Sequence, residues 1–160
     1  RDRKGTCRTR LSGFVIIDTN VLVSGMVCGC DTSPPRRIVE AMMAGHLRFV
    51  LSDALIREYR RVLLRQSIAQ RHGLSEAEVD RILVEIVVNA TMRETKTAGP
   101  GDESADAGGD AVPAGDAHVV ALLRSMPGCV LVTGDRRLAD AVRTWCEVVT
   151  PTAFAAHLGV

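Results

Sequence analysis

"FVIIDTNVLVSG", residues 14–25, is the stretch that decides the fold expected for this chain. Four apolar residues, from Phe14 to Ile17, lead into Asp18, and the chain becomes apolar again at Val21. A short run of this kind, rich in β-branched residues, predicts a buried parallel strand from Phe14 to Asp18. Because a buried carboxylate is costly to desolvate, we expect Asp18 either to have a structural partner or to hold a cation.

The composition fits one domain with a hydrophobic core. A chain of 160 residues is long enough for such a core, and 46% hydrophobic and 24% charged residues are ordinary fractions for a globular protein. Aromatic residues make up only 3%, so stacking on bases cannot be a major binding mode. The net charge of +1 gives no overall attraction to nucleic acid.

Two segments of the chain differ from the rest in charge and composition. The first ten residues are basic, whereas residues 93–115 contain mostly Gly, Ala, Asp, Thr and Pro and offer almost nothing to bury. The second pattern predicts a flexible loop or a disordered insert. We therefore expect a flexible basic tail over residues 1–12 and a single domain over residues 13–160, with a flexible insert at about 93–115.

Strand patterns and helix patterns alternate along the rest of the chain. Short apolar runs predict further strands at 47–51, 130–132 and 148–149. Caps and apolar periodicity predict helices at 34–44, from about 53, and at 76–89, 117–124, 138–144 and 151–158. Alternation of this kind implies right-handed crossovers and a parallel sheet, so the predicted fold class is a three-layer α/β domain.

Five cysteines, an odd number without regular spacing, argue against a disulfide framework. The Cys28-Gly29-Cys30 pair has no second pair to complete a zinc site, and we expect it to be a loop. The reducing cytoplasm fits this cysteine usage best. No apolar run approaches the roughly 20 residues of a membrane-spanning helix, and the basic leader lacks the apolar segment of a secretory signal. We therefore expect a cytoplasmic protein that is not membrane-bound.

Four acidic residues are candidates for one site. Asp18 and Asp135 each follow a predicted strand, Asp116 opens the helix that leads into the second of these strands, and Glu58 lies on the helix that starts near residue 53. Functional side chains gather at the carboxyl ends of strands in open parallel sheets. Converging carboxylates cannot all stay ionised without a cation, and hard oxygen ligands suit Mg²⁺ or Mn²⁺. Such ions support phosphodiester cleavage.

Each of these acids also has a local structural explanation. Asp18 and Asp135 could cap the helices that follow them, and Asp116 could be a first-turn helix acid. Glu58 could pair with Arg61, three residues further along the same helix. The joint pattern, rather than any single acid, indicates the metal site.

Four segments of the chain resemble the signature segments of the PIN-domain family, and in particular of VapC-like toxin components of toxin–antitoxin systems. The segments are VIIDTNVLVSG, LSDALIREYRRVL, DAHVVALL and VLVTGDRRL, and they occur in the family's order and spacing. The resemblance extends from Phe14 to the last predicted helix. It implies a three-layer α/β/α PIN-like fold with a central parallel sheet of about four to five strands, and an endoribonuclease activity that depends on Mg²⁺ or Mn²⁺.

The resemblance also assigns roles to individual residues. The family's acidic quartet falls on Asp18, Glu58, Asp116 and Asp135. Its polar positions beside the metal fall on Asn20 and Thr133, and a frequent small hydroxyl position falls on Ser24. Arg57, Arg60 and Arg136 are candidate phosphate contacts. The partners that the resemblance implies are an RNA substrate, a small antitoxin protein that inserts near the acids, and a second copy of the chain in a homodimer.

One departure from the family pattern leaves two questions open. Family members often read T-G-D-x-D-L in the last segment, whereas Arg137 stands here in place of the second acid. The number of metal ions, one or two, therefore stays open. A non-catalytic PIN-like module that binds RNA or protein is an alternative that Arg137 favours, whereas the presence of all four acids favours catalysis.

A second alternative is a phosphatase of the haloacid dehalogenase group. Gly134, Asp135 and Asp140 match one of its motifs, G-D-x-x-x-D. However, Asn20 stands where the first motif requires the general acid–base aspartate. The only lysines, Lys4 and Lys96, do not follow an apolar strand, as the lysine of that group must. These departures argue against a phosphatase.

Overall fold

The structure is a computed structural model that describes residues 13–95 and 116–158. The predicted tail over residues 1–12 and residues 96–115 of the predicted insert lie outside these ranges. Within them, no helix combines the length and the apolar character that crossing a membrane requires.

A parallel sheet lies at the centre of the fold and confirms the predicted fold class. β1 pairs with β4 and β4 with β5, while β2 pairs with β3. A parallel bridge between Val15 and Phe49 connects the two groups, so the strands follow the order β3-β2-β1-β4-β5. The strands are β1 (Val15–Ile17), β2 (Val50–Leu51), β3 (Thr91–Met92), β4 (Val130–Val132) and β5 (Glu147–Val149).

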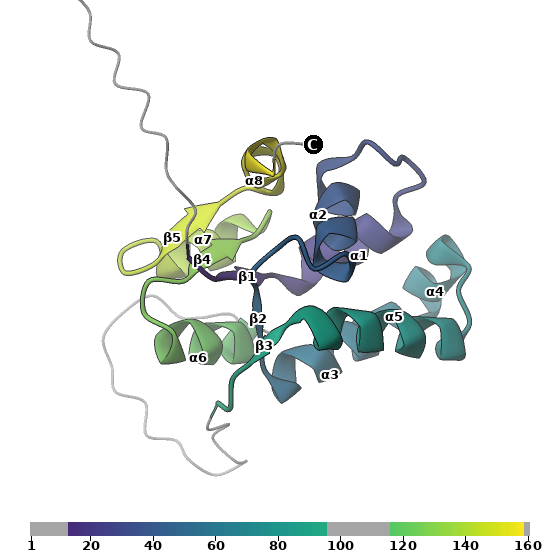
Figure 1. The fold of residues 1–160 in the computed structure, drawn as a ribbon, viewed down its shortest axis with the longest axis horizontal. Coiled ribbons are helices and arrows are strands. Elements are labelled where there is room, and N and C mark those ends of the chain that lie inside the picture. Colours follow the sequence, from purple (N-terminus) through teal and green to yellow (C-terminus); the bar gives the residue numbers. More distant parts are fainter. Residues whose placement is uncertain (1–12, 96–115, 159–160) are drawn as a thin grey trace, which may run out of the picture.

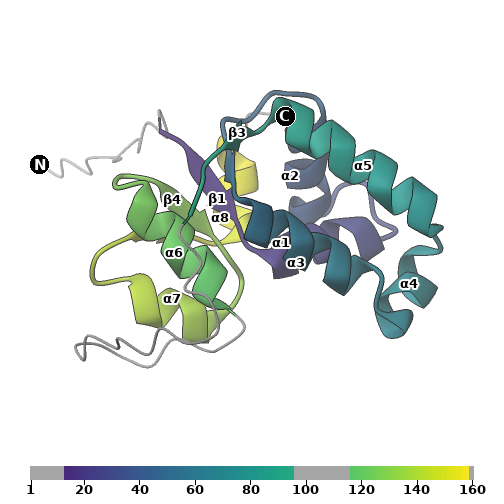
Figure 2. The same cartoon turned by 90° about the horizontal axis from the view of Figure 1, so that it is seen from below.

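Helices cover both sides of this sheet (Figure 1). Figure 2 shows α6 and α7 to one side of β1 and β4, and the helices α1 to α5 to the other side. The three layers expected for the fold are therefore present. The helices in the described ranges are α1 (Thr19–Val27), α2 (Pro34–Met43), α3 (Asp53–Leu63), α4 (Gln66–His72), α5 (Glu76–Asn89), α6 (Ala117–Ser125), α7 (Arg136–Val142) and α8 (Pro151–His157).

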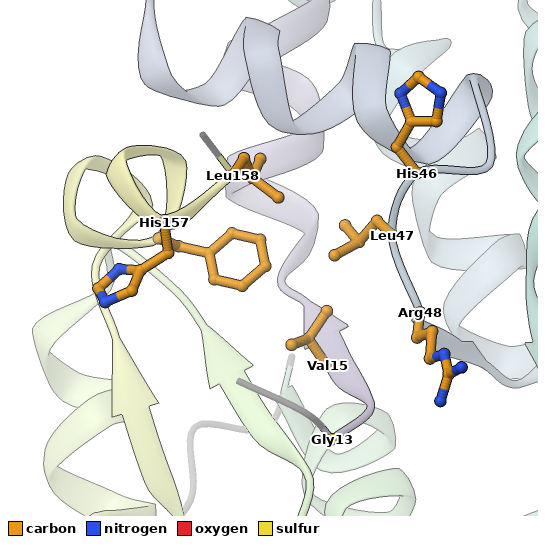
Figure 3. A pocket seen from close by; sticks show the side chains of 8 residues that line it. Gly13, Val15, His46, Leu47, Arg48, His157 and Leu158 are labelled. Atoms are coloured by element: carbon orange, nitrogen blue, oxygen red, sulfur yellow. The ribbon is translucent and has the colours of Figure 1, made fainter. Parts of the chain in front are cut away.

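A hollow of about 430 Å³ lies near the amino end of β1, at the opposite end of that strand from Asp18. Val15, Leu47 and Leu158 point toward its centre, whereas the imidazoles of His46 and His157, which also line it, point outward (Figure 3). None of the four candidate acids lines this hollow. It is therefore separate from the predicted site.

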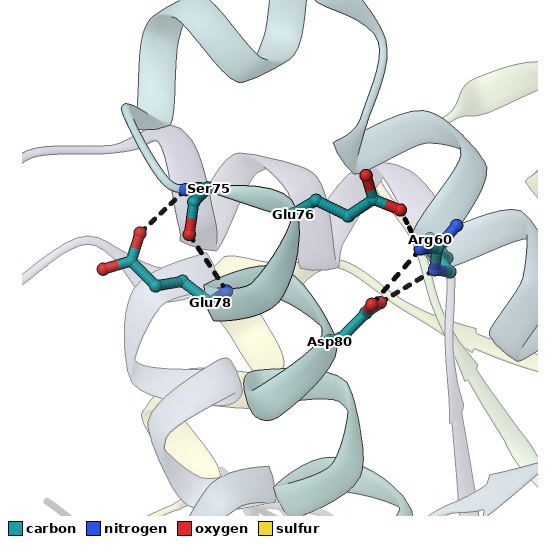
Figure 4. Close-up of polar contacts among 5 residues, drawn as sticks. All are labelled: Arg60, Ser75, Glu76, Glu78 and Asp80. Atoms are coloured by element: carbon teal, nitrogen blue, oxygen red, sulfur yellow. Dashed lines mark hydrogen bonds and ion pairs between the residues drawn. The ribbon is translucent and has the colours of Figure 1, made fainter.

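The predicted helix starts are confirmed at atomic detail. The hydroxyls of Ser33 and Ser52 accept hydrogen bonds from the first turns of α2 and α3. At α5, Ser75 and Glu78 form the reciprocal capping box that the sequence predicts (Figure 4). Gly45, with a φ of +71°, adopts the left-handed conformation where α2 ends.

The helix α1 is not predicted from the sequence. It begins directly after Asp18 and packs against α2, and Gly25 lies at the closest approach of the two. A Cβ atom on Gly25 would lie 2.6 Å from the carbonyl oxygen of Pro35 and 2.6 Å from a methyl group of Val39. The glycine of the opening stretch is therefore required by helix–helix packing.

The helix α3 is anchored to the end of β1 by a buried tyrosine. The predicted apolar face of α3, which includes Leu55 and Val62, is buried as expected. On the same face, Tyr59 is fully buried, and its hydroxyl donates a hydrogen bond to the carbonyl oxygen of Ile17. This contact fixes α3, and with it the neighbouring Glu58, beside the strand end that carries Asp18.

Candidate active site

Asp18 occupies the carboxyl end of β1 and is almost fully buried, with 2% of its surface exposed. The register that pairs Ile17 with Val132 brings Asp18 next to Thr133, although the two residues are 115 positions apart in the sequence. The Thr133 hydroxyl donates a hydrogen bond of 2.7 Å to Oδ2 of Asp18. Asp18 makes no side-chain cap for α1, so helix capping does not explain its presence.

The electrostatic environment of Asp18 disfavours its charge. The pKa of this carboxyl is raised from the ordinary value of 3.8 to about 6, mainly by burial and also by the carboxylates of Asp116 and Asp135, against the lowering effects of the Thr133 hydroxyl and the Thr19 backbone. These two hydrogen bonds are too little to offset the loss of water around Asp18. A positive charge bound beside Asp18 would therefore stabilise its ionised form.

Asp116 and Asp135 act on Asp18 from two different helices. Asp116 precedes α6 and makes no cap hydrogen bond, and partial burial together with the Asp135 charge raises its pKa. Asp135 caps α7, since its Oδ1 accepts hydrogen bonds from the backbone N–H groups of Arg137 at 2.9 Å and Leu138 at 3.4 Å. The predicted cap is present, and it leaves the second carboxylate oxygen of Asp135 outside these two bonds.

Glu58 forms an ion pair with Arg61, three residues further along α3. The guanidinium donates two hydrogen bonds to the carboxylate, at 2.8 Å and 2.7 Å, and this pairing lowers the pKa of Glu58. The local ion pair anticipated from the sequence is therefore present. Glu58 nevertheless belongs to the same electrostatic neighbourhood, because its charge raises the pKa of Asp116.

His118 is a member of this neighbourhood that was not identified from the sequence. It is half-buried on the first turn of α6, and burial lowers its pKa while the charges of Glu58 and Asp116 oppose that effect. The signal in the sequence was the spacing Asp116-x-His118 at a predicted helix start. The imidazole of His118 is therefore influenced by the charges of both Glu58 and Asp116.

The candidate residues fit a hard divalent cation in chemistry but are not preassembled around one. Within residues 13–95 and 116–158, no three His, Cys, Asp or Glu side chains lie close enough to hold one ion together. The donor set is nonetheless made of oxygen atoms and carries uncompensated negative charge at Asp18 and Asp116. In addition, Oγ1 of Thr19, beside Asp18, is buried with no hydrogen-bond partner, which is unusual for a hydroxyl. Side-chain rotation would be needed to close a cation site.

The remaining candidates from the sequence divide into exposed residues and one that is already paired. Asn20 and Ser24 are exposed on α1, and Arg57 and Arg136 are exposed on α3 and α7. The last candidate, Arg60, forms ion pairs with Glu76 and Asp80 of α5 (Figure 4). In this structure the charge of Arg60 joins α3 to α5, and its predicted contact with phosphate stays a prediction.

A comparison with models of protein families shows the family of this chain. The family model described as PIN domain matches residues 14–137, a segment that contains all four candidate acids. No curated protein matches the chain.

Proposed function

Because the chain belongs to the PIN domain family, we propose that it is an endoribonuclease that depends on Mg²⁺ or Mn²⁺. PIN domains are generally nucleases and generally use divalent metal ions. The observation that carries the proposal is the buried Asp18 with its pKa raised to about 6 beside two further carboxylates. The haloacid dehalogenase alternative is wrong, since the matched family is a different one.

In this proposal Asp18, Asp116 and Asp135 hold the ion. A divalent cation bound there neutralises charge on the scissile phosphate and lowers the pKa of an attacking water. Thr133 positions two of the acids at once, because its hydroxyl donates to Asp18 and accepts the backbone N–H of Asp135 at 3.0 Å. Glu58 adds negative charge from α3 while it is paired with Arg61.

RNA is the proposed substrate, with Arg57 and Arg136 as phosphate contacts. Arg57 lines a hollow of about 530 Å³ together with Arg93. This hollow borders the carboxyl ends of β2 and β3, and these strands run parallel to each other. Since parallel strands end at a common edge, RNA bound there would run toward Asp18. Asn20 and Ser24, exposed on α1, are proposed to support the metal-binding carboxylates.

The similarity of the four sequence segments to VapC-like proteins supports a more specific proposal. In it, the protein is the toxin of a toxin–antitoxin pair, acts in the cytoplasm, forms homodimers and is inhibited by a small antitoxin that binds near the acids. Expression in a bacterial host should arrest growth, and co-expression of a neighbouring gene should relieve the arrest. Normal growth at a verified level of folded protein would contradict the toxin role.

A second candidate function is a non-catalytic module that binds RNA or protein. Two observations favour it, namely that Glu58 is bound by Arg61 and that, among the residues the structure describes, no three acids lie close enough to hold one ion. Arg137, which stands where family members often have another acid, adds positive charge at the start of α7. Such a module would retain RNA without cutting it.

One assay panel distinguishes the two functions. Labelled single-stranded RNA is incubated with the protein and Mn²⁺ or Mg²⁺, and in parallel with EDTA. Fragments with 5′-phosphate ends that disappear with EDTA and with Asp18→Asn would support the nuclease, whereas RNA that is retained but intact would support the binding module. Asp140→Asn is the matched control, because Asp140 is exposed on α7 and pairs with Arg143 of the same helix.

A further inference from the structure

Two cysteines lie next to each other at the amino ends of β4 and β5. Cys129 immediately precedes β4, and Cys146 immediately precedes β5. These strands are parallel, with Val130 opposite Glu147, so the register continued back by one residue places Cys129 opposite Cys146. Neighbouring strands lie about 4.8 Å apart, which is within the range of roughly 4.4–6.8 Å that disulfides span between Cα atoms.

The side-chain contacts agree with this register. The Cys146 thiol lies 3.5 Å from the carbonyl oxygen of Cys129 and donates to it. Burial raises the pKa of both thiols, and the neighbouring Cys129 raises that of Cys146 further. Both cysteines are free thiols that pack against the hydrophobic core. Because the two residues are opposite each other on neighbouring strands, their side chains lie on one face of the sheet.

A hollow of about 320 Å³ gives small molecules access to this pair. Cys129 and Cys146 both line it, together with Trp145 and Arg124. The indole of Trp145 is 45% exposed, and the Arg124 guanidinium lies 5.7 Å from the ring centre. Cys129 is 6% exposed and Cys146 is half-buried, so the hollow admits a small oxidant to Cys146 first.

We propose that Cys129 and Cys146 form a reversible disulfide that joins β4 to β5. The oxidant is a low-molecular-weight disulfide. The Cys146 thiol loses its proton and its sulfur attacks this oxidant, which gives a mixed disulfide and releases one small thiol. The Cys129 sulfur then loses its proton and displaces the second small thiol. Two protein thiols are oxidised to one disulfide, and one small disulfide is reduced to two thiols.

The disulfide would act on stability and leave the acidic site unchanged. It closes a loop between residues 17 positions apart, which restricts the unfolded chain. Thr133 and Asp135 follow the carboxyl end of β4, whereas Cys129 precedes its amino end. Oxidation is therefore expected to raise the thermal midpoint by roughly 5–10 °C and to leave the action of the protein on RNA unchanged.

Peptide mapping of the oxidised protein tests this proposal directly. The folded protein is equilibrated with oxidised glutathione, alkylated and cut with trypsin. The expected product is peptide 125–136 linked to the peptide that begins at Thr144, with the loss of two hydrogens. The link should disappear with dithiothreitol and in Cys146→Ser and Cys146→Ala. A change in the fluorescence of Trp145, the only tryptophan of the chain, should accompany its formation.

A double variant, Cys28→Ser with Cys30→Ser, is the matched control. Cys30 is exposed, and a hydrogen bond with Thr32 lowers its pKa, so it should react faster than the buried pair. The double variant should still form the link between Cys129 and Cys146. If these two cysteines stay as separate thiols or mixed disulfides in the oxidised protein, or link to other cysteines instead, the proposal is wrong. Because the mapping uses wild-type protein, poor folding of a variant does not affect this outcome.

Discussion

At the scale of single residues, the negative charge of the buried Asp18 destabilises the folded protein. A carboxyl whose pKa is higher in the folded than in the unfolded chain destabilises the fold above that pKa, and the effect fades as the pH falls toward the unfolded value. For Asp18 the window runs from about 6 down to 3.8. Across this window the free energy of unfolding changes by about 1.4 kcal/mol per pH unit, so the charge of Asp18 lowers it by roughly 3 kcal/mol near neutral pH.

Replacement of Asp18 by asparagine should therefore stabilise the metal-free protein. We expect Asp18→Asn to raise the free energy of unfolding by roughly 1–3 kcal/mol at pH 7.5 in EDTA. The gain should shrink as the pH falls through 6 toward 3.8, because the wild-type carboxyl then takes up a proton. Urea denaturation at several pH values measures this difference. Asp140→Asn is the control, because this side chain is 73% exposed and its replacement should hardly change the free energy of unfolding. Equal stability of wild type and Asp18→Asn at every pH would contradict the account.

Thr133 reduces the destabilisation that the charge of Asp18 causes, because its hydroxyl donates a hydrogen bond to that carboxylate. Its hydrogen bond lowers the pKa of Asp18, so Thr133→Val should raise that pKa further. Since a carboxyl must lose its proton to bind a cation, Mn²⁺ affinity should fall roughly 10- to 100-fold, and more at pH 6 than at pH 8. Calorimetric titration at both pH values checks this. Thr133→Ser keeps the hydroxyl and should restore most of the affinity, and a loss independent of pH would indicate a packing effect instead.

At the scale of elements, α3 carries residues with three different tasks in succession. Glu58 faces the acids, Tyr59 anchors the helix to the end of β1, and Arg60 joins it to α5. The sequence predicted the buried face and the Glu58–Arg61 pair, because both depend on helical spacing alone. The partners of Arg60 could not be predicted, because they depend on how α5 packs.

Alanine substitutions should separate the arginines of α3. Arg60→Ala removes two partly exposed ion pairs, so it should lower the free energy of unfolding only slightly and leave RNA affinity unchanged. Arg57→Ala should instead weaken RNA binding and reduce its dependence on salt, with little change in stability. Filter binding at several salt concentrations, with thermal denaturation of the same samples, distinguishes them. The reverse pattern would remove Arg57 from the proposed RNA contacts.

Release of Glu58 from Arg61 should strengthen cation binding. Arg61→Gln removes a positive charge that is bonded to a member of the acidic neighbourhood. We expect Mn²⁺ affinity to rise roughly two- to fivefold, in line with the worth of an exposed ion pair. Arg36→Gln is the matched control, because Arg36 forms the same kind of helical pair with Glu40 at 2.9 Å on α2. Equal affinities of both variants and wild type would indicate that Glu58 takes no part in the metal site.

The elements that sequence reasoning missed have identifiable physical reasons. Helix α1 follows Asp18 with Thr19, Asn20 and three valines, residues with weak helix propensity, and most of its surface is buried, so no amphipathic period is visible. Helix α4 is seven residues long and buries none of them. Strand β3 has two exposed residues, and its pairing with β2 is set by tertiary contacts. In each case packing, rather than local pattern, decides the structure.

At the scale of the whole molecule, the parallel sheet brings distant residues to one edge. Asp18 and Thr133 meet because β1 and β4 are neighbours, which follows from the crossovers and not from either segment alone. The order of strands and helices was therefore enough to predict the edge of the sheet at which Asp18 and Thr133 meet. It could not predict that a half-buried His118 would be influenced by the charges of Glu58 and Asp116, because this depends on packing and side-chain conformations.

The central claim is that Asp18 and its acidic neighbours support metal-dependent cleavage of RNA. The most direct measurement is the rate of cleavage of a labelled RNA under single-turnover conditions, across a range of Mn²⁺ concentrations, for wild type, Asp18→Asn and Asp140→Asn. The account predicts saturable dependence on Mn²⁺ for wild type and Asp140→Asn, and a loss of at least roughly 100-fold for Asp18→Asn. Cleavage by Asp18→Asn at the wild-type rate, or wild-type cleavage that persists in EDTA, would contradict it.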